Sequence, residues 1–220
     1  MKRGSLKEFP LLCLLVAVLP ALGCAFGNTH TFDYRPRAPV SVGEGAVVIL
    51  FSVADRRPDI VAGDEPPEWV GEQRGGYGNP FNVKTTSGKP FSAIVAETVR
   101  RDLEAAGFDA VLVDESASAN SVGETIRSRG AQRGVAVVMH KFNSNTYVNI
   151  DVEWDFEVTV LDANGEAIGS NRETGKETLE GSFMNPPKAA KEKVPPFFYD
   201  IVHRLVVGNE EIREALTVSR

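Results

Sequence analysis

The chain has very little cysteine and histidine and no excess of positive charge. Two of its 220 residues are cysteines and three are histidines, and no two histidines have the His-x-x-x-His spacing of a zinc site. The formal net charge of −6 argues against a surface for nucleic acid. After residue 23 there is no further long apolar run, so no second membrane-spanning segment is predicted.

The first 24 residues carry the features of an export signal. Three basic residues precede an apolar run over residues 11–19, which is too short to span a bilayer comfortably. The sequence Pro20-Ala-Leu-Gly-Cys24 follows. This arrangement resembles a bacterial lipoprotein signal peptide with its lipobox. The resemblance implies cleavage between Gly23 and Cys24, a diacylglyceryl group on the Cys24 thiol, and acylation of the new amino terminus.

Two other interpretations of this segment stay open. Ala21 and Leu22 stand in the reverse of the usual lipobox order, so an ordinary secretory signal cleaved after Ala21 or Gly23 is one alternative. An uncleaved anchor is the other, although Pro20 and Gly23 interrupt the apolar run. Lipidation is favoured because Cys24 would be the one thiol left after processing, with no partner for a disulfide.

Processing would leave a mildly acidic protein. Without residues 1–23 the chain has 21 basic and 29 acidic residues, a net charge of −8. Such a surface does not favour anionic lipid headgroups, so we expect the lipid, and not a basic patch, to hold the protein at the membrane. Ala25, and not Asp, follows the cysteine, which under the usual enterobacterial sorting rule implies the periplasmic face of the outer membrane.

Composition divides the remaining chain into a spacer and one domain. Residues 24–45 are predicted to be the lipidated amino terminus and a flexible tether, because Gly and Pro punctuate them without a helical period. The periplasmic domain is predicted over 46–220 and begins with a buried strand over 46–53. A Gly- and Pro-rich excursion over 63–89 is predicted to be a functional or mobile loop.

The domain alternates between strand and helix patterns and then changes. Helices are predicted over 90–107, around Ile126, over 196–207 and after Asn209, and buried strands over 108–113 and 135–139. Residues 150–160 alternate between apolar and mostly acidic residues, and Asp162-Ala-Asn-Gly165 is typical of a hairpin turn before a return strand over 167–180. We therefore predict a single α/β (α+β) domain with a mixed sheet: β-α-β-α-β, an antiparallel β-hairpin and a C-terminal helix.

The alternating strand carries a row of carboxylates on one face: Asp151, Glu153, Asp155 and Glu157. Side chains two residues apart lie about 7 Å apart on a strand, and their oxygens would suit a hard cation such as Ca²⁺. The alternative is a solvated face whose charges meet Arg172 or Lys176 on the return strand. We favour the solvated face and predict no metal site and no cofactor.

Two other patterns fall short of catalysis. Thr85-Thr-Ser-Gly-Lys-Pro90 partly matches a phosphate loop, but it lacks the first glycine, and Pro90 replaces the hydroxyl residue that meets Mg²⁺. His140 ends a predicted strand, where α/β proteins place functional groups, whereas His30 lies in the tether and His203 off an apolar helix face. No nucleophile-elbow serine accompanies them, so we expect no enzyme.

Trp69 and Tyr77 lie at the Gly- and Pro-rich part of the 63–89 excursion. Aromatic side chains on loops make good anchors, so both residues are candidates for contact with a partner or ligand. The alternative is that both rings pack down and hold the loop on the domain.

Three short motifs occur in order along the domain: VADRRPD at 53–59, GYG at 76–78 and LEAAGF at 103–108. Together they resemble the YajG family of bacterial envelope lipoproteins, over about residues 45–205 and behind the lipoprotein signal. The resemblance implies an envelope lipoprotein with no established activity. Residues 181–196 have no counterpart in that resemblance.

The sequence therefore favours a lipid-anchored envelope lipoprotein that acts as a non-catalytic periplasmic scaffold or accessory protein. Its partners would be the membrane, through the N-terminal lipid, and an envelope protein. The alternative is a ligand-binding lipoprotein that holds a small molecule, glycan or cation at residues 63–89 or on the acidic strand face.

Replacing Cys24 tests the anchor. Because the acyl chains are predicted to be the attachment, Cys24→Ala should move the protein from the membrane fraction to the soluble periplasm. Mass spectrometry of the unsubstituted protein should show a mature amino terminus at Cys24 that carries acyl groups. An unacylated mature terminus would instead identify a soluble periplasmic or secreted protein.

Overall fold

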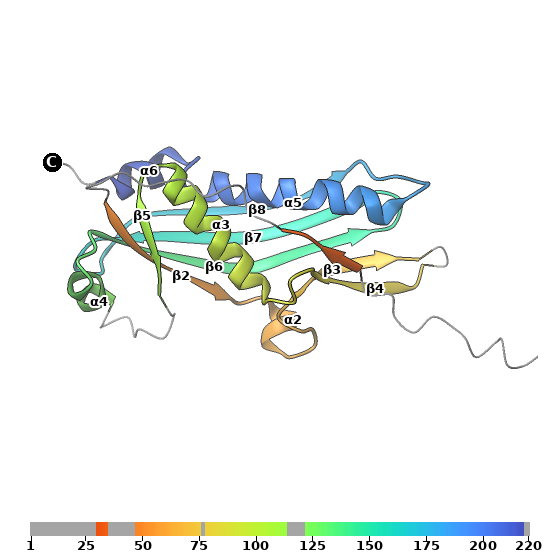
Figure 1. Cartoon of the computed structure of the whole chain (residues 1–220), viewed down its shortest axis with the longest axis horizontal. Coiled ribbons are helices and arrows are strands. Elements are labelled where there is room, and N and C mark those ends of the chain that lie inside the picture. Colours follow the sequence, from red (N-terminus) through yellow and green to blue (C-terminus); the bar gives the residue numbers. More distant parts are fainter. Residues whose placement is uncertain (1–29, 35–46, 76–77, 114–121, 218–220) are drawn as a thin grey trace, which may run out of the picture.

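The computed structural model describes residues 30–34, 47–75, 78–113 and 122–217. Within them, eight strands form one mixed sheet, and the helices α3, α5 and α6 lie along one of its faces (Figure 1). The strands are β1 His30–Phe32, β2 Val48–Asp55, β3 Trp69–Arg74, β4 Pro80–Thr85, β5 Asp109–Leu112, β6 Arg133–Thr146, β7 Ile150–Leu161 and β8 Ala167–Leu179. The helices are α2 Pro58–Val61, α3 Phe91–Ala105, α4 Val122–Ser128, α5 Pro186–Leu205 and α6 Glu210–Leu216.

The 14-residue strand β6 organises the sheet. On one side it pairs antiparallel with β7 along its length, and β8 follows β7. On its other side the first half of β6 pairs with β2 and its last residues pair with β3, both in parallel. The strand β5 extends the sheet from β2, while β4 and β1 extend it from β3. The sheet therefore forks along β6, where the register shifts between Met139 and Lys141.

A buried arginine, Arg57, closes the fork. Its Nε and Nη2 donate to the Asp55 carboxylate at 3.0 and 2.8 Å, its Nη1 donates to the Trp69 carbonyl at 2.6 Å, and Nη2 also reaches the Pro67 carbonyl at 3.3 Å. The side chain is only 1% exposed. The planar guanidinium thus supplies donors to the end of β2 and the start of β3, where the parallel ladder changes partner.

Arg57 also joins the fork to the aromatic core. Its guanidinium carbon lies 5.9 Å from the ring centroid of Trp69 and 5.4 Å from that of Phe91, within the range of cation–π contact. Phe91 begins α3, and its ring lies 4.8 Å from Phe142 on β6 and 5.1 Å from Phe198 on α5. The Arg57 side chain therefore contacts both branches of the sheet and the start of α3, whose Phe91 lies in the centre of the core.

The core lies between the sheet and the helices α3, α5 and α6. Alternate residues of β7 are buried beneath these helices: Val152, Trp154, Phe156, Val158 and Val160. A smaller cluster around Ile126 lies under α4 on the opposite face, where Val48 of β2 and Leu161 of β7 meet it. The alternation of β2 separates the clusters, because Ile49 belongs to the main core and Val48 to the smaller one.

The predicted fold class is confirmed. β2, β5 and β6 pair in parallel, as their short crossovers predict, and β7 and β8 form the expected antiparallel hairpin. At its turn the Asp162 carboxylate accepts the Asn164 N–H at 2.8 Å, and Gly165 has the positive φ of +85° expected there. Asn209 caps α6 through the Ile212 N–H at 3.1 Å.

The prediction that residues 63–89 form a loop was wrong, because β3 and β4 form an antiparallel pair within this range. Its glycines do not all mark a loose chain. A Cβ on Gly71 would lie 2.1 Å from the Ser144 carbonyl oxygen, so the residue lets β3 approach β6 closely. The tether prediction was wrong for residues 30–34, since β1 pairs with β4 and buries Phe32 and Tyr34.

The helix predicted over 196–207 begins ten residues earlier and is continuous through two prolines. Asn185 caps it by accepting the Lys188 N–H at 3.2 Å, and Pro186 and Pro187 occupy the first turn, where no backbone donor is needed. Pro195 and Pro196 stand inside the helix. Packing overrides this local break, because α5 buries residues on both sides of the prolines, among them Ala190, Val194, Phe198, Ile201 and Val202.

Substituting Arg57 tests the fork. Arg57→Ala leaves the Asp55 carboxylate without its cation in a largely buried place, so we expect the free energy of unfolding to fall by about 3–5 kcal/mol. Arg57→Lys should restore only part of this, because an ammonium cannot reproduce the planar set of donors. The exposed neighbour is a control, and Arg56→Ala should change stability by less than about 1 kcal/mol. Urea denaturation measures all three, and a loss below about 1 kcal/mol in Arg57→Ala would contradict the role given to Arg57.

Candidate functional site

On the face of β6, β7 and β8 opposite the helices α3, α5 and α6, the one described helix is the short α4, which packs at the start of β6 and the end of β7; no other described helix covers this face (Figure 1). We call this surface the open face. It is built from alternate residues of the strands, and the irregularity after Met139 brings both His140 and Lys141 to it. Its charged side chains are His140, Lys141, Asp151, Glu153, Asp155, Glu157, Arg172 and Lys176.

Every carboxylate of the β7 row has a partner from a neighbouring strand. Arg172 binds Asp155 with two hydrogen bonds of 2.7 Å, and Lys176 donates to Glu153 at 2.9 Å. Lys141 also pairs with Glu153 from the other side. The Thr178 hydroxyl donates to Asp151 at 2.6 Å, and His140 Nε2 lies 3.4 Å from Glu157 Oε2. The predicted pairing of the row with Arg172 and Lys176 is therefore confirmed.

These contacts stabilise the charged forms of Glu153 and Asp155. Hydrogen bonds from Lys141 and Lys176 lower the pKa of Glu153 from 4.5 to about 2, and the hydrogen bonds from Arg172 lower the pKa of Asp155. Both groups stay ionised at neutral pH, with cations of the chain itself as partners. Among the described residues, no group of three or more His, Cys, Asp or Glu side chains is placed to hold a metal ion. The open face thus presents paired charges on a flat strand surface.

The outer edge of this surface is also uncovered by other strands. β8 has 13 residues and, within the described part of the chain, pairs only with β7. Arg172 and Lys176 remain 55% and 60% exposed although they are paired. Charged side chains on an edge strand discourage unspecific sheet-to-sheet association, while the backbone of the edge can still accept a matched strand.

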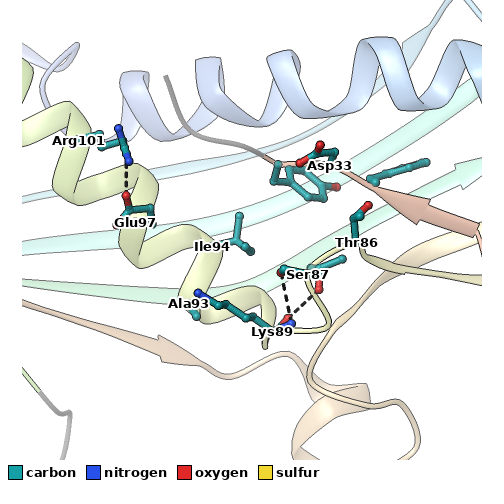
Figure 2. A pocket seen from close by; sticks show the side chains of 11 residues that line it. Asp33, Thr86, Ser87, Lys89, Ala93, Ile94, Glu97 and Arg101 are labelled. Carbon is teal, nitrogen blue, oxygen red and sulfur yellow. Dashed lines mark hydrogen bonds and ion pairs between the residues drawn. The ribbon is translucent and has the colours of Figure 1, made fainter. Parts of the chain in front are cut away.

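A separate cavity of about 460 Å³ lies between the end of β1, the turn before α3, and α3 itself (Figure 2). We call it the Tyr34 pocket. Asp33, Thr86, Ser87, Lys89 and Ile94 line it, and Glu97 and Arg101 pair with each other at its rim. Tyr34 also lines it, and its buried hydroxyl has no hydrogen-bond partner among the described residues. Burial raises the pKa of Tyr34 well above its ordinary value, so the hydroxyl keeps its proton.

The residues that partly match a phosphate loop form the turn of this pocket. The Thr85 hydroxyl donates to the Lys89 carbonyl at 2.7 Å, and Gly88 has a positive φ of +65°. The turn delivers the chain to Pro90, the residue that precedes the first turn of α3. The segment therefore leads into the helix.

The aromatic candidates lie in different places. Trp69 is only 5% exposed and its ring faces Arg57, which is the position that the packing alternative expected. Tyr77, and likewise Gly23 and Cys24, lie outside the described residues, so their roles stay predictions. His203 is exposed, as its position off the apolar helix face predicts, and its Nδ1 lies 3.0 Å from Asp102.

Two features were not predicted from the sequence: the burial of Tyr34 and the exposure of Phe183 and Met184. Tyr34 was assigned to the tether, although its alternation with Phe32 has the period of a half-buried strand. Phe183 and Met184, in the segment between β8 and α5, are 82% and 88% exposed. No periodicity marks them, because an exposed apolar pair in a connecting segment has no sequence pattern of its own.

The comparisons with known proteins do not establish a family. No family model and no curated protein matches the chain. Protein XCC0632 of Xanthomonas campestris, from family DUF330, is similar with a TM-score of 0.45 and 12% identity, covering 83% of this chain and 99% of that one. The PelC dodecamer of Paraburkholderia phytofirmans is similar with a TM-score of 0.40 and 15% identity, covering 84% of this chain and 97% of that one. Lipoprotein GNA1162 of Neisseria meningitidis is similar with a TM-score of 0.31 and 13% identity, covering 70% of this chain and 99% of that one.

Similarities at these TM-scores carry no conclusion about fold or function. They do not name the YajG family, so that resemblance stays a prediction. Among the described helices, none combines the length and the hydropathy that crossing a bilayer requires.

Proposed function

We propose that the chain is a lipid-anchored envelope lipoprotein that acts as a non-catalytic scaffold, and that it binds an envelope protein through the open face. The observation that carries this proposal is the surface of β6, β7 and β8, which described helices leave uncovered except for α4 at one end, and whose edge strand β8 has no outer strand partner among the described residues. The lipid anchor rests on the sequence around Cys24.

The open face suits recognition because its charges are fixed in place. Arg172 is held by two hydrogen bonds to Asp155, and Lys176 by one to Glu153, so both cations keep a defined position while more than half exposed. A partner would meet an ordered pattern of charge on a rigid sheet, which favours specificity over raw affinity.

Binding is preferred to catalysis because of where the histidines lie. The His140–Glu157 and His203–Asp102 pairs are on the surface, and neither histidine lines the Tyr34 pocket. A general base works best in a cleft that excludes water and brings it within reach of a nucleophile.

A photo-crosslinking residue at Thr174 tests the open face. Thr174 is exposed and opposite Asp155 in register, so its side chain lies between those of Arg172 and Lys176. In native envelopes we expect one discrete crosslinked product, lost when Arg172→Glu and Lys176→Glu are combined. The same probe at Glu214, an exposed position on α6, is the control. Equal products at Thr174 and Glu214, or none at Thr174, would contradict the proposal.

Ligand binding in the Tyr34 pocket is a second candidate function. The observation that favours it is the buried Tyr34 hydroxyl, because leaving such a group unpaired costs about 1–3 kcal/mol unless a ligand or water satisfies it. A panel of glycans and Ca²⁺ should then include a compound that raises the thermal unfolding temperature. Tyr34→Phe should abolish that shift while keeping the fold, whereas Thr174→Ala should retain it. A flat response to the whole panel would count against this candidate.

A further inference from the structure

Three large apolar side chains are exposed at the end of the sheet where β6 runs into β7 and β8 leads to α5. Phe183 is 82% exposed, Met184 88% and Tyr147 50%. Phe183 and Met184 follow β8, and Tyr147 lies in the turn between β6 and β7 (Figure 1). We call these three residues the apolar end. Large apolar groups exposed together mark a contact surface more often than a single one does.

The backbone holds the pair Phe183–Met184 in place. On one side the Ser182 N–H donates to the Val148 carbonyl at 3.0 Å. On the other side the Asn185 N–H donates to the Ser182 hydroxyl at 3.1 Å, and Asn185 in turn caps α5. The pair is thus presented by a built turn between two anchored residues, with its side chains left in solvent.

The neighbouring residue Gly181 shows how closely this turn is packed. A Cβ at that position would lie 1.7 Å from the Val148 carbonyl oxygen, so no larger residue fits without a backbone shift. The segment after β8 therefore packs closely against the β6–β7 turn, and Tyr147 and Phe183 line the same groove.

The same end receives the chain that leads to Cys24. His30, at the start of β1, lines a groove of about 430 Å³ together with Tyr147, Phe183 and Pro186. Only five residues, 25–29, lie between Cys24 and His30. However those residues are arranged, they reach at most about 20 Å. Given the proposed lipid on Cys24, His30 at one side of this groove lies within about that distance of the bilayer.

Charge does not explain a contact here. The basic side chains around the apolar end are Arg74, Lys188, Lys191 and Lys193, and the acidic ones are Glu72, Glu180 and Glu192. Three of the four cations pair with these carboxylates, at 3.6, 3.8 and 3.5 Å. The near balance leaves little attraction for anionic headgroups, so apolar burial must supply the affinity.

We propose that Tyr147, Phe183 and Met184 form a membrane-contact surface that inserts into the interfacial region of the bilayer carrying the Cys24 lipid. Amphipathic rings such as tyrosine are favoured at that depth, and phenylalanine and methionine gain from leaving water. The inference rests on the proposed lipid anchor. It adds that the anchored domain has one defined end towards the membrane.

This contact fixes the orientation of the open face. β6 and β8 end near the apolar end and β7 begins there, so the long axis of all three strands extends away from it (Figure 1). With that end at the bilayer, the strands project from the membrane and the open face stays accessible in the aqueous phase. A short tether and a second contact restrict rotation far more than the lipid alone would.

Vesicle binding of the mature chain, residues 24–220 with Cys24→Ala, tests the contact without the lipid and without the apolar run of residues 11–19. We expect this protein to co-sediment weakly with vesicles of phosphatidylethanolamine and phosphatidylglycerol in a 3:1 ratio. Adding Phe183→Ser and Met184→Ser should lower the partition coefficient about tenfold or more, because two large apolar side chains no longer leave water. Replacing phosphatidylglycerol by phosphatidylcholine should change it by less than about threefold, because the charges are nearly balanced.

The matched control is Val61→Ser, which removes an apolar side chain that is 67% exposed on α2, and it should leave binding unchanged. No vesicle binding by Cys24→Ala, or equal binding with and without the two serine substitutions, would overturn the membrane contact. The membrane contact would also be overturned if the Phe183→Ser, Met184→Ser variant bound vesicles as before but lost the crosslinked product seen with the probe at Thr174. That result would indicate that the apolar end contacts a protein partner. The protein in this experiment carries no lipid, so its outcome does not depend on whether Cys24 is acylated. Mass spectrometry of the mature amino terminus tests the lipid anchor separately.

Discussion

The fork of the sheet depends on one buried cation. β6 is too long to be matched by a single parallel neighbour, so it pairs first with β2 and then with β3. The junction exposes backbone acceptors inside the protein, and buried acceptors without partners are costly. Arg57 meets them with a fixed set of donors, and Asp55 balances its charge. This contact joins the two branches directly at the point where β6 changes partner.

The fork in turn positions the three surfaces described above. The branch of β3, β4 and β1 brings Tyr34 beside α3, which creates the Tyr34 pocket, and sets His30 at the groove of the apolar end. On the other side of β6, the unbroken strands β7 and β8 form the open face. The proposed partner surface, the Tyr34 pocket and the proposed membrane contact therefore lie at different places on one domain.

Local patterns predicted the elements that long-range contacts do not alter. The alternation over 150–160, the Asp-Ala-Asn-Gly turn and the capped helix after Asn209 all act within a few residues, and the structure has them. The pairing of Arg172 and Lys176 with the acidic row was also predictable, because a hairpin turn fixes the register of its strands. β1 was not, since its partner β4 lies far along the chain, and β3 and β4 were not, since the glycines and prolines of this segment indicated a loop. Glycine at position 71 indicated a loop but serves close packing against Ser144.

Net charge predicts that apolar groups, and not basic ones, would hold this chain at a membrane, but it does not predict where on the domain such a contact would lie. The acidic total agrees with the balanced charges around Lys188 and Lys193, which leave apolar contact as the means of touching a bilayer. The location emerged only when the turn after β8 placed Phe183 beside Tyr147 and His30. The sequence did not predict this turn, because the proline pair at the start of α5 is typical of both irregular segments and first helical turns.

The central claim is that the lipidated domain stands with its apolar end in the bilayer and its open face in water. The mature chain would carry no thiol other than the acylated Cys24, so Met184→Cys and Thr174→Cys each introduce a unique site for an environment-sensitive fluorophore. On vesicles that hold the lipidated protein, we expect the label at position 184 to shift to the blue and resist quenching by iodide, and the label at position 174 to be quenched as in water. Equal quenching at the two positions would contradict the claim.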